Sequence, residues 1–251
     1  MNNKSCHVRC CLQSFTCRCP SAFGVFLRTR SAAHRTKHLH QQNHALGGIP
    51  HGRSPARPRQ LPLLALARSG SQRLDLRFHR HLPCEADYPD FNGVAFEDRE
   101  HQGQGGWTTG QLLAALPGWL EETGAPDIVI FSSPGGNDGL QGLSFEEALA
   151  NVNTIIDVLQ EANPRVTILL GQPAPPKNGD AELLADLEAM QQNVPLIAAE
   201  QTTTTSLVIA VDLFTDFDPQ AMIADNVHYN ELGADFIATR LYKVLSGVLE
   251  P

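Results

Sequence analysis

The sequence has no long apolar run. None of its stretches reaches the roughly 18 apolar residues that a membrane-spanning helix needs. The apolar stretch near the amino terminus, residues 21–27, is too short and too poorly flanked for a signal peptide. We therefore expect no membrane partner, and the sequence indicates no localisation.

Cysteine pairs with metal-binding spacing are also absent. Five of the six cysteines precede residue 20, but no two of them form the C-x2-C pair that holds zinc. They are Cys6, Cys10, Cys11, Cys17 and Cys19. The sequence therefore predicts no metal site.

Basic residues are scarce after residue 82. Residues 83–251 contain five of the 19 lysines and arginines but 26 of the 27 aspartates and glutamates. Residues 1–82 have the opposite composition, with 14 basic residues, eight of the ten histidines and one acid, Asp75. This break predicts two parts, a basic segment over residues 1–82 and a folded domain over residues 83–251.

The basic segment lacks sustained helical or strand periodicity, which favours disorder or non-native sequence. A basic arm can bind nucleic acid or an acidic surface. This one has neither interleaved aromatic residues nor a recognisable binding module. We therefore expect no nucleic-acid partner.

Beyond Cys84, apolar runs of strand length alternate with amphipathic stretches of helix length. Strands are predicted over residues 126–133, 165–173 and 206–214, and helices over residues 108–124, 144–164, 180–194 and 230–249. Thr108 and Ser144 are expected to cap helices, with Glu147 completing a capping box at the second. The alternation predicts an α/β fold with a parallel sheet covered by helices on both faces.

Polar residues gather in loops at the ends of the predicted strands. The loops are 135–138, 172–176 and 225–228. Ligands of such sheets bind beyond the carboxyl ends of the strands. There His228 is a candidate general base, and Asp225 can orient and stabilise its imidazole. Asn137 can donate a hydrogen bond to an oxyanion.

Each of these residues also has a structural explanation. Asn137 and Asp138 fit an ordinary hydrogen-bonded loop after a glycine turn. Asp225 fits a cap of the last helix, and a single histidine on a loop is usually solvated. Trp107 and Trp119 are expected to be packing residues.

Three stretches, taken in order, resemble conserved blocks of the SGNH (GDSL-like) hydrolases. "HQGQGGWTTGQLLAALPGWL" (101–120), "PDIVIFSSPGGNDGL" (126–140) and "DNVHYNELGADFIATRLYKVL" (225–245) are similar to the second, third and fifth blocks of the carbohydrate-esterase branch. The resemblance implies a three-layer α/β/α flavodoxin-like fold and ester hydrolysis through an acyl-enzyme, without metal or cofactor. By position it implies that Gly103 and Asn137 are oxyanion donors, and that Asp225 and His228 are the acid and base of a triad. Gln102, Gln104 and Gly136 depart from the family's usual Glu, His and Thr.

The family's nucleophile block is not found. Its serine lies in G-D-S or G-E-S after the first strand, and nothing in residues 1–100 has that form. Ser54, Ser69 and Ser71 lack a preceding apolar strand and are poor candidates. The nucleophile stays unassigned, so we expect the first strand to be missing or aberrant and the activity to be impaired.

A one-nucleotide frame shift accounts for this loss. Read one nucleotide forward, the codons of residues 44–51 can spell M-P-L-G-E-S-L-T, those of residues 59–63 G-S-Y-R, and those of residues 77–82 V-F-T-G-T. These match, in order, the family's first block, its downstream stretch and the end of its second strand. We therefore interpret residues 1–82 as out-of-frame translation.

Together these observations predict a hydrolase of short-acyl or acetyl esters, whose substrate is a small-molecule or carbohydrate ester. A non-catalytic glycan-binding protein on the same scaffold is the alternative. Nucleic-acid binding through residues 1–82 is the third interpretation.

Overall fold

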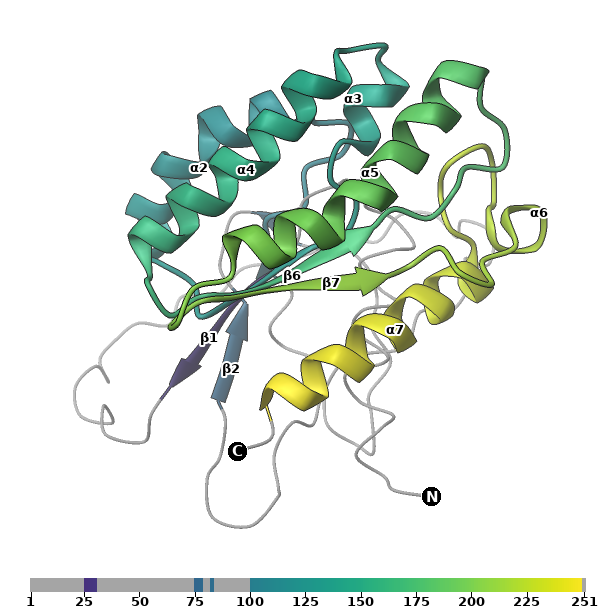
Figure 1. Ribbon diagram of the computed structural model, residues 1–251. Helices are drawn as coiled ribbons and strands as arrows, with labels where there is room; N and C mark the ends of the chain where they lie inside the picture. Colours follow the sequence, from purple (N-terminus) through teal and green to yellow (C-terminus); the bar gives the residue numbers. More distant parts are fainter. Residues whose placement is uncertain (1–24, 31–74, 79–81, 84–99, 250–251) are drawn as a thin grey trace, which may run out of the picture.

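A computed structural model of the chain describes residues 25–30, 75–78, 82–83 and 100–249. In Figure 1, helices α2, α4 and α5 lie on one face of a sheet and α7 on the other. The strands are β1 (Val25–Arg30), β2 (Asp75–Phe78), β3 (Leu82–Pro83), β4 (Glu100–His101), β5 (Ile128–Phe131), β6 (Thr167–Gln172) and β7 (Leu207–Asp212). The helices are α2 (Thr109–Thr123), α3 (Gly136–Leu140), α4 (Phe145–Ala162), α5 (Ala181–Gln201), α6 (Pro219–Met222) and α7 (Glu231–Leu249). This arrangement confirms the predicted three-layer α/β/α fold.

The main sheet has the strand order β2-β1-β5-β6-β7. Strands β5, β6 and β7 are parallel to one another, as predicted. Strand β1 runs antiparallel to β5 and to β2, so the sheet as a whole is mixed. Residues 44–51, where we place the lost nucleophile block, lie outside the described residues, as do residues 59–63.

The three parallel strands alternate their side chains between two buried cores. Phe131 and Leu170 pack on the side of α2, α4 and α5, whereas Ile130 and Leu169 pack on the side of α7. All four are at most 3% exposed. Burial on both faces explains why these strands read as continuous apolar runs in the sequence.

The helix starts agree with the predicted caps, with one difference. At α2, Thr108 accepts the N–H of Gln111, and the Gln111 side chain accepts the N–H of Thr108 at 3.0 Å. At α4, Ser144 accepts the N–H of Glu147 at 3.2 Å, as predicted. The side chain of Glu147 does not accept the backbone N–H of Ser144, which would complete the box. The Ser144 hydroxyl donates to the carboxylate of Glu146. The complete capping box is therefore at α2, and the one predicted at Ser144 is wrong.

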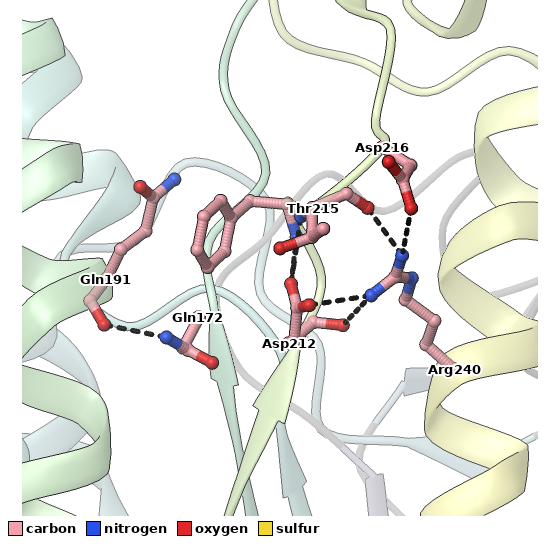
Figure 2. A network of polar contacts seen from close by, with 7 residues as sticks. Gln172, Gln191, Asp212, Thr215, Asp216 and Arg240 are labelled. Atoms are coloured by element: carbon pink, nitrogen blue, oxygen red, sulfur yellow. Dashed lines mark hydrogen bonds and ion pairs between the residues drawn. The ribbon is translucent and has the colours of Figure 1, made fainter.

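Helix α5 continues past its predicted end at residue 194 and contains Pro195. A proline has no N–H for the carbonyl four residues earlier, which here belongs to Gln191. The side chain of Gln172, at the end of β6, donates to that carbonyl at 2.8 Å (Figure 2). Beyond the proline, Ile197 and Ala198 remain buried and extend the apolar face of the helix. A remote side chain and continued burial therefore offset the cost of the proline.

Candidate active site

Three loops lie at the carboxyl edge of the parallel strands. Helix α3 follows β5, residues 173–180 follow β6, and residues 213–230 follow β7 (Figure 1). Asn137 lies on the first of these segments, and Asp225 and His228 lie on the third. Gly103 lies in the stretch that precedes α2.

Asp225 and His228 form a direct side-chain pair. One carboxylate oxygen of Asp225 contacts Nδ1 of His228. The other accepts the backbone N–H groups of Val227 and His228, each at 2.9 Å. These two bonds curl the loop, so that an aspartate three residues before a histidine reaches its ring. The imidazole side chain is 43% exposed, so a substrate can approach it.

The electrostatics of this pair suit a general base. Hydrogen bonds from the backbone and ring of His228 and from the backbone of Val227 hold the pKa of Asp225 well below its ordinary value. The carboxylate is therefore charged near neutral pH and accepts the Nδ1–H of the imidazole. This selects the tautomer whose Nε2 carries the lone pair, which is the form that accepts a proton.

Asp225 does not cap the last helix. Helix α7 begins at Glu231, and the side chain of the preceding Asn230 accepts the N–H of Gly233 at 3.1 Å. The backbone N–H of Asn230 donates to the carbonyl of Met222 at 3.0 Å. The alternative role considered for Asp225 is therefore wrong, and the carboxylate serves His228.

Residues 225–228 are hydrogen-bonded to the loop after β6. The backbone N–H of Lys177 donates to the carbonyl of Asn226 at 2.8 Å. The side chain of Asn178 donates to the Asn226 side chain at 3.0 Å, and Gln220 donates to the Lys177 carbonyl at 3.1 Å. Because Asn226 lies between Asp225 and His228, these bonds limit the movement of the pair.

The glycine turn after β5, where we expected a loop, leads into a short helix, α3. Its Asn137 is 7% exposed and donates from its side-chain amide to the carbonyl of Trp107 at 2.8 Å. Gln141 donates to the carbonyl of Gly106 at 2.8 Å. These bonds join α3 to the stretch that contains Gly103. The amide nitrogen of Asn137 has a second N–H that this bond does not use.

Asp138 holds the start of α2. Its carboxylate is buried and accepts the backbone N–H of Thr109 at 2.9 Å and the Thr109 hydroxyl at 2.7 Å. The Asn151 side chain donates to the same hydroxyl at 3.2 Å. A carboxylate at a helix N-terminus is favoured by the helix dipole. The structural explanation therefore holds for Asp138, because its carboxylate holds Thr109 at the first residue of α2.

Two glycines accommodate the turn that joins β5 to α3. Gly135 has φ +73°, and a Cβ there would lie 2.8 Å from the Cε of Met190. A Cβ at Gly136, where the family usually has Thr, would lie 2.6 Å from the hydroxyl of Ser133. Glycine in place of the family's usual Thr at position 136 therefore leaves room for the Ser133 hydroxyl.

The remaining predictions have separate outcomes. Trp107 and Trp119 stack with ring centroids 5.8 Å apart; Trp119 is buried in the core and Trp107 packs against it, as expected of packing residues. Within residues 100–249 and the shorter described segments, no three His, Cys, Asp or Glu side chains are grouped to hold a metal ion. No helix in those ranges has the length and apolar character to cross a membrane.

The remaining candidates for a nucleophile or a metal ligand lie outside the described residues. They are Ser54, Ser69, Ser71, Cys6, Cys10, Cys11, Cys17 and Cys19.

Sequence analysis missed a polar network that joins β7 to α7. Arg240 bonds to Asp212 and to the carbonyl of Thr215 (Figure 2). One signal was available, because Arg240 is one of five basic residues in the 169 positions after residue 82. A lone arginine among many acids is expected to be paired.

Comparison with known protein families identifies a family profile that matches this chain. The sequence profile described as the GDSL-like Lipase/Acylhydrolase family matches residues 67–236. This range includes Gly103, Asn137, Asp225 and His228. A search of curated proteins found no match.

Several solved structures have a similar fold. The crystal structure of an acetyl esterase, a serine-to-alanine variant with an acetate ion, is 26% identical with a TM-score of 0.57, covering 67% of this chain and 78% of that one. A carbohydrate esterase of family 3 from Talaromyces cellulolyticus is 25% identical with a TM-score of 0.57 and the same coverage. A family 3 carbohydrate esterase from Clostridium thermocellum is 23% identical with a TM-score of 0.52, covers 68% of this chain and 81% of that one, and supports the fold alone.

The profile match spans more than half of the chain, and the parallel strands, covering helices and polar carboxyl edge agree with it. The chain belongs to the GDSL-like lipase/acylhydrolase family of ester hydrolases, as its resemblance to the SGNH hydrolases led us to expect.

Proposed function

We propose that this protein, when it contains the family's serine block, hydrolyses carboxylic esters with short acyl groups by a Ser-His-Asp mechanism. Acetyl esters of carbohydrates are among the proposed substrates. The hydrogen-bonded pair of Asp225 and His228 carries the proposal. The acetyl esterase and the family 3 carbohydrate esterases with similar structures support the substrate class.

In this mechanism Nε2 of His228 removes the proton of a serine hydroxyl, whose oxygen attacks the acyl carbon. The negative charge on the tetrahedral oxygen is met by the free N–H of the Asn137 amide and by the backbone N–H of Gly103. Collapse of this intermediate transfers the proton from His228 to the departing alcohol and leaves an acyl-enzyme. A water molecule, deprotonated by His228, then releases the carboxylic acid and restores the serine.

We further propose that the chain as written is impaired, because its sequence has no serine in the family's nucleophile block. Without that hydroxyl the base has no covalent partner to activate. Direct attack by a water activated by His228 remains open to it and is much slower than the acyl-enzyme route.

The test compares two proteins: the full chain as written, and a frame-restored chain in which codons 40–82 are read one nucleotide forward. Each is assayed with p-nitrophenyl acetate and with acetylated xylo-oligosaccharides, with and without His228→Ala. We expect activity in the frame-restored chain, a fall of about 10⁴-fold on substitution of His228, and little hydrolysis by the chain as written. Ester hydrolysis by the frame-restored chain that does not depend on His228 would refute the mechanism.

A non-catalytic glycan-binding role on the same scaffold is the second candidate, and the missing serine block favours it for the chain as written. Isothermal titration of that chain with deacetylated and acetylated xylo-oligosaccharides tests it. Saturable binding without release of acetate supports this role, and absence of heat at millimolar glycan contradicts it.

A further inference from the structure

The last residue of β7, Asp212, organises the turn that starts the segment carrying His228. One of its carboxylate oxygens accepts the backbone N–H groups of Phe214 at 3.0 Å and Thr215 at 2.9 Å. Partial burial raises the pKa of Asp212, but the bonds from Thr215 and Phe214 and the charge of Arg240 outweigh it and lower the pKa. Asp212 is therefore a charged anchor at the start of residues 213–230.

Arg240, on α7, bonds to both sides of this turn, as Figure 2 shows. Its Nη1 donates to the second carboxylate oxygen of Asp212 at 2.8 Å and to the Asp212 carbonyl at 3.2 Å. Its Nη2 donates to the carbonyl of Thr215, and lies 3.7 Å from the carboxylate of Asp216. We call Asp212, Thr215 and Arg240 the Arg240 clamp. Only a planar group with several N–H donors makes all of these bonds at once.

The turn held by the clamp shows backbone strain. Asp216 has φ +63°, and within the described residues no other non-glycine residue has a positive φ. Such a conformation persists where surrounding contacts determine it. The contacts of Arg240 with Thr215 and Asp216 supply that constraint.

A row of aromatic rings leads from the clamp to His228. The guanidinium carbon of Arg240 lies 4.6 Å from the centre of the Phe236 ring. Phe236 packs edge-on against Phe217 with centroids 5.5 Å apart, and Phe217 packs likewise against Tyr229 at 5.6 Å. Tyr229 directly follows His228 and forms an antiparallel bridge with Ile223. The two ends of segment 213–230 are thus joined through one packed group.

We infer that Arg240 is a positioning residue for His228. From α7, the helix that follows segment 213–230, it holds the start of that segment in place. The segment begins after Asp212, the last residue of β7, and ends before Glu231, the first residue of α7. The clamp joins the two elements that flank the segment. Loss of the clamp frees the turn at Thr215 and loosens the packing of Phe217 on Tyr229. The imidazole then no longer stays against Asp225.

The inference rests on the proposed role of His228, but its test needs no activity. In the full chain labelled with ¹⁵N, the Nδ1–H proton of His228 gives a downfield signal when it is held by Asp225, and His228→Gln assigns that signal. We expect Arg240→Met to abolish it well below the unfolding temperature and Arg240→Lys to leave it weaker. Lys243→Met, an exposed position on the same helix, is expected to retain it.

A second control separates positioning from general stability. Asn163→Ala removes the bond to the Pro126 carbonyl at the start of β5, at the opposite edge of the sheet, and lowers stability without touching the clamp. We expect this variant to keep the His228 signal. If Arg240→Met does not fold, Asp212→Asn takes its place, because it keeps the turn's acceptor oxygen and removes the charge.

Retention of the signal in Arg240→Met or Asp212→Asn, with a loss of stability like that of Asn163→Ala, would overturn the inference. The network would then only join β7 to α7. A different outcome would refute the proposed function: His228→Ala would leave ester hydrolysis by the frame-restored chain unchanged, while the His228 signal would still depend on Arg240.

Discussion

The side-chain amide of Asn137 donates a hydrogen bond to the main-chain carbonyl of Trp107 across 2.8 Å, and so joins α3 to the stretch before α2. This bond fixes the plane of a buried amide and directs its second N–H away from Trp107. In the proposed mechanism, this N–H would meet the developing negative charge without reorganisation of the amide.

Asn137→Ala in the frame-restored chain is expected to lower kcat by about 10²–10³-fold, because one preorganised donor to the oxyanion is lost. The measurement is the steady-state hydrolysis of p-nitrophenyl acetate. Asn151→Ala is the matched control, since Asn151 is also an amide that bonds near the start of α2, but it contacts the Thr109 hydroxyl. Equal effects of the two substitutions on kcat would assign Asn137 a structural role.

Asp225→Asn is expected to change the pH dependence of stability. The pKa of Asp225 is lowered in the folded chain, so its carboxylate stabilises the fold above the unfolded pKa of about 3.9, and this contribution is lost as pH falls toward the folded pKa. The parent chain should unfold at a higher temperature than Asp225→Asn at pH 7, and the difference should narrow below about pH 4.

Thermal unfolding followed by circular dichroism from pH 7 to pH 3 measures this difference. Asp157→Asn, at an exposed position of α4, is the control and should differ little from the parent at any pH. A difference for Asp225→Asn that stays constant down to pH 3 would exclude the carboxylate as its source.

Gly171→Ala is expected to destabilise the sheet by about 1–3 kcal/mol or more, because an added methyl group must displace packed atoms. A Cβ there would lie 2.4 Å from the Ser132 carbonyl and 2.6 Å from the Leu213 side chain. Gly118→Ala, in an open position of α2, should instead stabilise the chain by about 0.5–1 kcal/mol. Urea unfolding measures both, and tolerance of Gly171→Ala would contradict this packing.

The local elements of this fold could be predicted from the sequence, because their causes lie within a few residues. The amphipathic pattern and the cap at Thr108 place α2, and the continuous apolar run of β5 follows from its burial on both faces. The pair of Asp225 and His228 was also predictable, since a curl of three residues brings them together.

Contacts between distant segments could not be predicted in this way. Arg240 and Asp212 are 28 positions apart, and no local pattern indicates that they pair. Likewise, Pro195 predicts the end of a helix, and the sequence does not show that Gln172 of β6 bonds to the carbonyl that the proline leaves without a donor. The central pair could be predicted because its two residues are three positions apart, whereas the contacts that support the site join distant segments and could not.

The contact of Gln172 with the helix at Pro195 predicts a coupling between the two positions. Gln172→Ala should cost about 1 kcal/mol in the parent chain, because the Gln191 carbonyl loses its donor. In the background of Pro195→Ala, the new backbone N–H supplies that carbonyl, so the same substitution should cost much less. A double-mutant cycle from urea unfolding measures the coupling, and additive effects would show that Gln172 does not compensate for the missing N–H of Pro195.

The nucleotide sequence provides the last prediction. If residues 1–82 are translated out of frame, codons 44–51 read one nucleotide forward must encode G-E-S within M-P-L-G-E-S-L-T, and the frame must return near residue 82, where the composition changes. Sequencing codons 40–85 from the source DNA and from its transcript tests this. If the transcript encodes the forward frame, the given amino-acid sequence contains an error. If the transcript encodes the given sequence, the gene carries a genuine frame-shift lesion. Codons that cannot encode G-E-S in the forward frame would refute the frame shift and return the question of the nucleophile to the serines of residues 1–82.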